Sequence, residues 1–204
     1  MKKFELTSET KINIFGKKLF RIKALISFAD VEAGETGGWV EKEGNVNQSG
    51  NAWVYGNAEV YGDAEVYGNA EVSGNAEVYG DAEVSGNAKV YGDAIVSGDA
   101  WVYGDAIVYG NAIVSGDAIV SGNAKVSGNA KVYGNADYTT IHGFGTQFRT
   151  TTFFRCKDKK VRVACGCFFG TIPEFREQVK NTRKGKIAEE YLMIADLMEN
   201  HFEK

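Results

Sequence analysis

The sequence has very little proline, cysteine and histidine, and these shortages narrow the class of protein. Of its 204 residues, one is proline, three are cysteine and two are histidine. So little proline excludes collagen-like chains and proline-rich linkers. The three cysteines are odd in number and confined to residues 156–167. This usage indicates reduced thiols rather than a disulfide framework.

Long apolar runs are missing as well. The opening residues, MKKFEL, carry charges and lead into no apolar core of signal-peptide length. No run approaches the ~20 apolar residues that a membrane-spanning helix needs. We therefore expect a cytoplasmic protein with no membrane partner.

Basic residues are scarce in the middle of the chain. Residues 50–137 contain three basic and twelve acidic side chains, a net charge of −9, whereas residues 1–49 carry +1 and residues 138–204 carry +4. An acidic segment of this size repels phosphate backbones. We therefore expect no nucleic-acid partner. Only residues 138–204 have a net positive charge large enough to attract one.

Glycine, in contrast, is abundant and occurs at a fixed interval. From Gly50 to Gly134 a glycine stands at every sixth position, fifteen in all, without an insertion. The unit reads Gly-(Asn/Asp)-Ala-x-Val-(Tyr/Ser), as in GNAEVY at residues 56–61. An unbroken short period of this kind predicts a solenoid.

The spacing within the unit predicts short strands. Alanine and valine lie two positions apart, so in an extended strand both point to one side while x points to the other. A helix is excluded, because each glycine would cost about 1 kcal/mol and a six-residue period drifts around a 3.6-residue helix. Gly followed by Asn or Asp bends sharply at low cost. Three such sides make a triangular coil of eighteen residues with Ala and Val inside, and about five coils fit into residues 50–137.

This repeat resembles the hexapeptide repeat of left-handed parallel β-helices over about 87 residues. The resemblance implies a mainly β chain whose central part is a left-handed, triangular parallel β-helix. A right-handed solenoid, as in bactofilin-type filament proteins, is the alternative, because the spacing does not fix the hand.

The two flanks are expected to cover the open ends of the solenoid, since an uncapped solenoid exposes strand edges and apolar surface. In residues 1–49 we predict a hairpin that turns at Gly16-Lys17. Irregular capping coils should follow over residues 28–50, in which Trp39 and Val40 are too bulky for the later register.

In residues 138–204 we predict a small ββαα module. The hairpin occupies residues 150–165. The first helix begins at Thr171, ahead of Pro173 and Glu174, and runs to about Thr182. The second runs from about Lys186 to Phe202, and its apolar stripe consists of Ile187, Tyr191, Ile194, Leu197 and Met198.

The flanks also resemble small hexapeptide-repeat proteins encoded by bacteriophages and prophages. The similar segments include FRIKAL at residues 20–25, GGWV at residues 37–40 and CGCFFGTIPEF at residues 165–175. This resemblance implies a phage or prophage origin and a location in the host-cell cytoplasm. It supplies no activity.

The outward x positions change character along the coils. They begin at Trp53, continue as glutamates, become large and apolar, and end as lysines. The apolar group, which we name the girdle, consists of Ile95, Trp101, Ile107, Ile113 and Ile119. It occupies all three faces and is more apolar surface than a monomer leaves bare. Either the C-terminal helices fold back over part of the girdle, or another molecule covers it.

One face has a self-complementary order. Its x residues are Glu59, Glu77, Ile95, Ile113 and Lys131. An antiparallel pair centred on Ile95 would set Glu59 against Lys131, the form that isologous contacts take. The resemblance to left-handed β-helices, which commonly trimerise, supports a parallel trimer instead. We therefore predict a homo-oligomer, dimer or trimer, and allow a host protein or small molecule as a further partner.

Residues for catalysis or metal binding are few. Hexapeptide-repeat acyltransferases use a histidine as general base, and residues 50–136 contain none. His142 is the candidate nearest the coils, and a structural role at a domain junction is its other interpretation. Cys156, Cys165 and Cys167 could bind zinc with His142 as fourth ligand, but no CxxC pair is present, and buried thiols are the other interpretation.

These features predict a non-enzymatic scaffold or binding protein that needs no catalytic residue, metal or cofactor. Its partner would be a second copy, a host defence factor or a small molecule. The alternative function is a divergent hexapeptide-repeat acyltransferase with His142 as its base.

Overall fold

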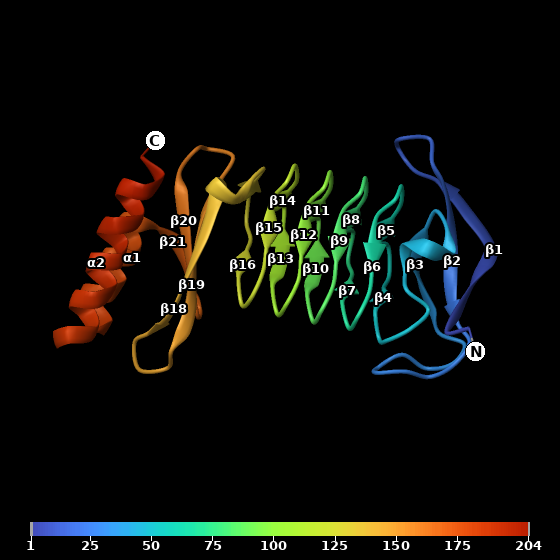
Figure 1. Cartoon of the computed structure of the whole chain (residues 1–204), viewed down its shortest axis with the longest axis horizontal. Coiled ribbons are helices and arrows are strands. Elements are labelled where there is room, and N and C mark those ends of the chain that lie inside the picture. Colours follow the sequence, from blue (N-terminus) through green and yellow to red (C-terminus); the bar gives the residue numbers. More distant parts are fainter. Residues whose placement is uncertain (1, 204) are drawn as a thin grey trace.

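The computed structural model describes residues 2–203, which form three parts in a row (Figure 1). A β-hairpin with an irregular first coil comes first, a stack of regular coils follows, and a four-stranded sheet with two helices ends the chain. The two termini lie at opposite ends of the resulting rod. None of the helices in residues 2–203 is long and apolar enough to cross a membrane.

The repeat forms a parallel solenoid with three faces. Each strand residue pairs with the residue eighteen positions later, as Ile95 does with Ile113 and Trp101 with Ile119. Every repeat alanine and valine from Ala52 to Val132 is completely buried. The predicted mainly β fold of about five coils, with alanine and valine inside, is confirmed.

The strands on each face are short and stack in register. Face 1 contains β5 (Glu59–Val60), β8 (Glu77–Val78), β11 (Ile95–Val96), β14 (Ile113–Val114) and β17 (Lys131–Val132). Face 2 contains β4 (Trp53–Val54), β7 (Glu71–Val72), β10 (Lys89–Gly92), β13 (Ile107–Gly110) and β16 (Lys125–Val126). Face 3 contains β6 (Glu65–Val66), β9 (Glu83–Val84), β12 (Trp101–Val102) and β15 (Ile119–Val120).

Glycine at the corners satisfies two requirements at once. Gly74 has a φ of 71°, a left-handed angle that side chains disfavour. A Cβ built on Gly74 would also lie 2.9 Å from the backbone nitrogen and oxygen of Gly92 in the next coil. The strict six-residue glycine period is therefore needed both for the bend and for the close stacking of coils.

Most of the backbone hydrogen bonds between coils outside the strands run in one direction. The N–H of Glu59 donates to the Ala76 carbonyl, and the N–H of Glu77 donates to the Ala94 carbonyl, both at 2.9 Å. Within the strands the bonds also run the other way, because the parallel pairing of Glu59–Val60 with Glu77–Val78 makes the Val78 N–H donate back to the Glu59 carbonyl. The forward bonds are the more numerous, so the first regular coil is left mainly with carbonyls that need donors, and the last mainly with N–H groups that need acceptors.

The N-terminal flank supplies donors. The Lys3 ammonium, which is buried, donates to the Ala52 carbonyl at 2.8 Å, and the Arg21 guanidinium donates to the Gly56 carbonyl at 3.0 Å. Burial lowers the pKa of Lys3 from 10.5 to about 8. Two cationic side chains thus replace N–H groups that a preceding coil would have offered.

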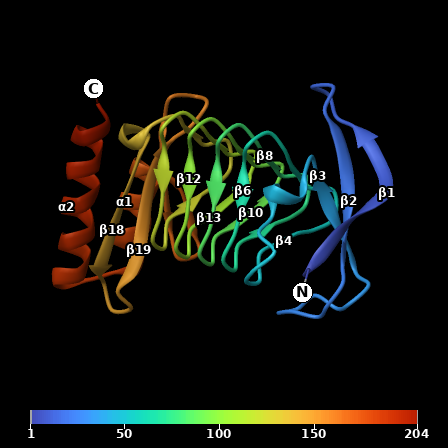
Figure 2. The same ribbon diagram turned by 45° about the vertical axis from the view of Figure 1, so that its right-hand side comes forward.

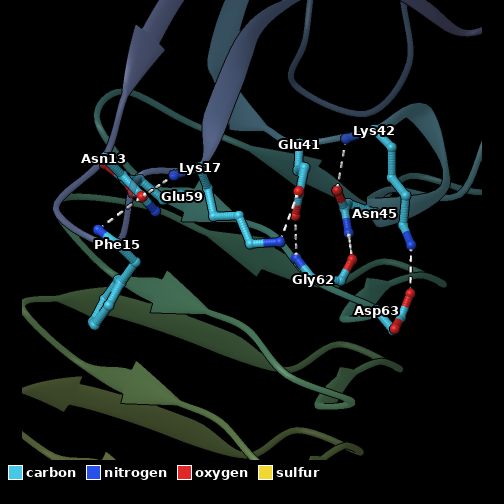
Figure 3. A network of polar contacts seen from close by, with 9 residues as sticks. All are labelled: Asn13, Phe15, Lys17, Glu41, Lys42, Asn45, Glu59, Gly62 and Asp63. Carbon is cyan, nitrogen blue, oxygen red and sulfur yellow. Dashed lines mark hydrogen bonds and ion pairs between the residues drawn. The ribbon is translucent and has the colours of Figure 1, made fainter.

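Asn45 performs the same task at the start of face 3. It ends the 3₁₀ turn Glu43–Asn45 and is completely buried. Its amide nitrogen donates to the Gly62 carbonyl at 3.1 Å, and its oxygen accepts from the Lys42 N–H at 2.9 Å (Figure 3). The amide nitrogen also donates to the Ala64 carbonyl at 2.9 Å. All hydrogen-bonding groups of this side chain are used.

The C-terminal flank supplies acceptors. The 3₁₀ turn Asn135–Asp137 and strand β19 (Arg149–Arg155) bring polar side chains against the last coil. The pairs are Ile119 N–H with Asn135 Oδ1 at 2.9 Å, Lys125 N–H with Thr152 Oγ1 at 3.0 Å and Tyr133 N–H with Asp137 Oδ2 at 2.9 Å. In these contacts the side chains of the C-terminal flank accept, whereas Lys3, Arg21 and Asn45 of the N-terminal flank donate.

The N-terminal hairpin is confirmed, but one detail of the prediction is wrong. Strands β1 (Phe4–Ile12) and β2 (Lys18–Ala24) pair antiparallel, and β2 continues to β3 (Thr36–Val40), which joins face 1. Trp39 pairs with Glu59 and Val40 with Val60, so both fit the later register. Trp39 is tolerated because it occupies an outward x position, where the Lys11 ammonium lies 4.5 Å from its ring centre.

The C-terminal module has more strands than predicted. The predicted hairpin is formed by β19 and β20 (Val161–Cys165), but β18 (Tyr138–Phe144) and β21 (Phe168–Thr171) flank it and complete a four-stranded antiparallel sheet. Glycines interrupt both extra strands, at Gly143 and Gly170, which obscures them in the sequence. The ββαα prediction is therefore incomplete.

The two helices follow the prediction closely. Helix α1 (Ile172–Thr182) starts after the N-cap Thr171, which forms a capping box with Glu174. Helix α2 spans Gly185–Phe202. Leu197 was expected on its buried stripe but is 59% exposed, and Ala195 is buried instead.

The helices do not cover the girdle. They pack on the outer side of the C-terminal sheet, which lies between them and the coils in both views (Figures 1 and 2). Their buried residues join Phe153 and Val163 of the sheet in a separate core. The alternative in which they fold back over the girdle is wrong, because the sheet already buries their apolar faces.

Replacing Asn45 should destabilise the protein. Asn45→Ala leaves the buried Ala64 carbonyl and the partly buried Gly62 carbonyl without this donor, so we expect the free energy of unfolding to fall by about 1–3 kcal/mol. Urea denaturation followed by circular dichroism measures this. Asn111→Ala, an exposed asparagine of the repeat, is the matched control and should change stability by less than about 0.5 kcal/mol. Equal stabilities of the two variants would contradict the capping role.

Acid should remove the contribution of Glu41. Its carboxylate accepts from the Gly62 N–H at 2.7 Å and pairs with Lys17 at 3.0 Å (Figure 3). The Gly62 N–H and then Lys17 hold the pKa of Glu41 below its usual value of 4.5. The stabilisation is therefore present above the pKa of the unfolded state and is lost as the pH falls through the folded pKa.

We expect Glu41→Gln to be less stable than the wild type at neutral pH, and the difference in stability to shrink as the pH falls below the usual glutamate pKa of 4.5. Denaturant titrations across this range measure the difference. Glu5→Gln, at an exposed position of β1, should give a small difference without pH dependence. A Glu41→Gln difference that stays constant down to pH 3 would rule out this role.

Candidate functional site

The girdle is exposed most on face 3. Trp101 is 46% exposed and Ile119, directly after it in the stack, is 36% exposed. Tyr103, the corner residue two positions after Trp101, is 40% exposed. These three side chains form a contiguous apolar patch on adjacent coils, which we name the face 3 patch.

Face 1 carries a flatter part of the girdle. Ile95 and Ile113 are half-buried and stack on each other, between Glu77 on one side and Lys131 on the other. The corner residues beside the two isoleucines, at positions 97 and 115, are serines. At this corner, therefore, no bulky side chain stands beside the apolar strip.

Glu59 is already paired within the chain. Its carboxylate lies 2.8 Å from Lys11 Nζ of the hairpin, and its side chain is 18% exposed. Phe15 at the hairpin tip packs on the rings of Tyr61 and Tyr79, which stand at the corner of face 1. The hairpin thus covers the Glu59 end of face 1, which the sequence did not reveal.

The first x residue, Trp53, is not part of the outward surface. It is completely buried, with the rings of Phe4 and Phe28 at 5.9 and 5.4 Å from its ring. The N-terminal flank thus covers Trp53 on face 2. Ile107 on the same face is half-buried beside the stacked pair Tyr91 and Tyr109.

Tyrosine hydroxyls donate hydrogen bonds to glutamates that stack on one another in adjacent coils. Glu65 pairs with Glu83 in the next coil, an arrangement that places like charges side by side. The Tyr67 hydroxyl donates to Glu83 at 2.6 Å, and the Tyr61 hydroxyl donates to Glu77 at 2.9 Å. The corner tyrosines therefore have a structural role in the acidic coils.

The four candidate zinc ligands are not brought together. Cys156 is buried against the last coil, where it bridges Ala130, whereas Cys165 lies at the other end of the β19–β20 pair opposite Thr151. Cys167 is exposed in the turn that follows. In residues 2–203 there is no group of three or more His, Cys, Asp or Glu side chains that could hold a metal ion.

His142 lies in β18 and is exposed. Its Nδ1 is 3.1 Å from Thr150 Oγ1 on the neighbouring strand. Within the described chain no carboxylate hydrogen-bonds to its ring, the contact that would orient a general base.

Two cavities flank the turn between β20 and β21, and the sequence did not predict them. The first, of about 370 Å³, lies between this turn, the β18–β19 loop and both helices, and includes Arg149, Tyr191 and Arg183. The second, of about 660 Å³, lies between the turn and the last coil and includes Lys125 and His142. The +4 charge of residues 138–204 was the only sequence signal for them.

The thiols should differ in reactivity. Burial raises the pKa of Cys156 to about 11, so little reactive thiolate exists at pH 8. We expect iodoacetamide to modify the exposed Cys167 at least about tenfold faster than Cys156 in the native protein. Peptide mass spectrometry measures both rates, and unfolding in urea should make them similar. Equal native rates would contradict the burial of Cys156.

Comparisons with known proteins agree with the fold. Residues 88–104, 100–116 and 106–122 match the family model described as YdcK Beta solenoid repeat. No curated protein matched the chain. The left-handed winding, the hexapeptide-family membership and the phage origin stay predictions. Coils and family match together establish that this chain contains a β-solenoid repeat.

Proposed function

We propose that the protein is a non-enzymatic scaffold that associates with a second copy of itself through face 1. The observation that carries this proposal is the order of side chains on that face. Glu77, Ile95, Ile113 and Lys131 follow one another on successive coils, with an acid at one end and a base at the other.

A two-fold axis between Ile95 and Ile113 makes this order self-complementary. In an antiparallel pair, Ile95 of one copy faces Ile113 of the other, and Glu77 faces Lys131. Each charged contact then occurs twice, as in isologous interfaces. This two-fold axis replaces the one centred on Ile95. An axis at Ile95 would pair Glu59 with Lys131, but the Glu59 carboxylate is already paired with Lys11.

The surroundings of the strip favour such a contact. Glu77 and Lys131 are half-buried, and Lys131 has no carboxylate partner in the described chain. Ser97 is small and buried, so the strip presents a level surface. Phe15, 59% exposed at the hairpin tip, adds apolar surface at the edge of face 1. Burying these groups against a second copy removes them from water.

The other part of the girdle is available to a different partner. The face 3 patch of Trp101, Tyr103 and Ile119 lies outside the face 1 pair. Tryptophan and tyrosine are the residues most enriched at interface hot spots. A host protein, as the resemblance to phage proteins implies, would bind there.

A binding role agrees better with the side chains than the acyltransferase alternative. His142, the only histidine near the coils, has Thr150 as its sole hydrogen-bonding neighbour in the described residues. The coils from residue 50 to residue 136 contain no loop excursion that would shape an active site. The proposal therefore assigns His142 no catalytic role.

Charge reversal tests the face 1 pair. We expect the wild type to sediment as a dimer at micromolar concentration, and Glu77→Lys or Lys131→Glu alone to weaken dimerisation at least about tenfold. The double variant Glu77→Lys/Lys131→Glu restores opposite charges and should dimerise again. Analytical ultracentrifugation over a concentration series measures each dissociation constant.

The matched control is Glu83→Lys on face 3. Glu83 accepts from a tyrosine hydroxyl just as Glu77 does, so the two substitutions disturb the coil equally. The control should leave dimerisation unchanged. A monomeric wild type, or a double variant no better than the single ones, would overturn the proposal.

A further inference from the structure

Two arginines of the C-terminal module have no ion-pair partner within residues 2–203, and both line one cavity. Residues 138–204 contain five arginines. Three form ion pairs: Arg155 with Asp137, Arg162 with Asp158, and Arg176 with Asp196 and Glu199. Arg149 and Arg183 form no ion pair among the described residues, yet they meet at the same 370 Å³ cavity.

The cavity holds no carboxylate to neutralise them. None of the residues lining it, or lining the neighbouring cavity with Lys125 and His142, is Asp or Glu within the described part of the chain. Arg183 donates from one nitrogen to the Thr182 carbonyl at 3.2 Å, which leaves its other donors unused. Guanidinium groups without a carboxylate partner in the protein commonly bind the carboxylate or phosphate of a ligand.

The floor of the cavity is apolar and well fixed. Phe175 and Val179 of α1 and Tyr191 of α2 are buried there, with Phe168 beside them. The rings of Phe175 and Tyr191 meet edge to face at 5.8 Å, and the Tyr191 hydroxyl donates to the Phe144 carbonyl at 3.2 Å. A ligand with an apolar or planar body could rest on this floor.

Two glycines bring the polar groups close. A Cβ on Gly166 would lie 2.5 Å from Arg149 Nη1, and one on Gly145 would lie 2.5 Å from the Tyr191 hydroxyl. Burial and then Cys165 raise the pKa of Tyr191, and Arg183 and Arg149, which line the same cavity, oppose that rise. The guanidinium groups and the aromatic floor thus face one space.

We infer that this cavity binds a small organic anion, with a carboxylate or phosphate head held by Arg149 and Arg183 and an apolar or aromatic body against Phe175, Val179 and Tyr191. The volume lies at the lower end of the range of small-molecule sites. The inference is independent of the face 1 pair, because the two regions share no residue.

Calorimetry with simple probes tests the site. Phenyl phosphate and benzoate carry the two candidate heads on the same ring, and benzyl alcohol is their neutral analogue. We expect at least one anion to bind with one site per chain and the alcohol not to bind. The tighter of the two anions identifies the head group.

Variants assign the binding to the cavity. Arg149→Gln and Arg183→Gln should each weaken binding of the anion about tenfold, the effect of losing one charge-assisted contact, and the double variant should abolish it. Lys180→Gln, an exposed charge of α1 outside the cavity, is the control and should change affinity less than twofold. Melting curves verify that each variant is folded.

A second measurement needs no variant. Cys167 lines the cavity and is exposed, so the bound anion should slow its alkylation in the wild type, whereas Cys156 should react as before. The inference is overturned if neither anion binds at concentrations up to roughly 10 mM, where even weak sites saturate. Equal binding of benzyl alcohol, or undiminished binding to the folded double variant, would overturn it as well.

Discussion

The structure depends on the direction of one hydrogen-bond ladder. Because most of the hydrogen bonds between coils run from one coil to the coil after it, the stack has an excess of open carbonyls at its start and of open N–H groups at its end, whatever its length. The two ends therefore need different caps. At the first coil the donors are an ammonium, a guanidinium and a side-chain amide. At the last coil the acceptors are a hydroxyl, an amide oxygen and a carboxylate. The flanks are thus complementary to the stack and differ from each other for that reason.

The sequence predicted the coils because one local rule repeats there. Glycine sets each bend, and alanine and valine fill the inside, so neighbours in the sequence decide the structure. The caps could not be predicted in this way. Lys3 lies 49 positions from the carbonyl of Ala52 that it reaches, and Trp39 takes its place in register only after a 20-residue step instead of 18. Such contacts depend on how separate segments meet.

The same division applies to the candidate sites. The girdle was found in the sequence because x residues point outward by periodicity, and its residues indeed include exposed Trp101 and Ile119. The sequence did not predict the pairing of Glu59 with Lys11 or the cavity lined by Arg149 and Arg183. Each of them joins two elements that no periodic rule relates. Strands β18 and β21, which flank the predicted hairpin, were not predicted, and the cavity therefore could not be predicted either.

The eighteen-residue register has a consequence for how the molecule can change over time. Duplication or loss of one coil in the middle of the stack moves the two end modules by ~4.8 Å relative to each other and leaves the contacts of both caps intact, since the end coils are unchanged. Any other insertion length would disturb the stacking of glycine on glycine. The distance between the ends of the rod is therefore quantised, and evolution can adjust it only in whole coils.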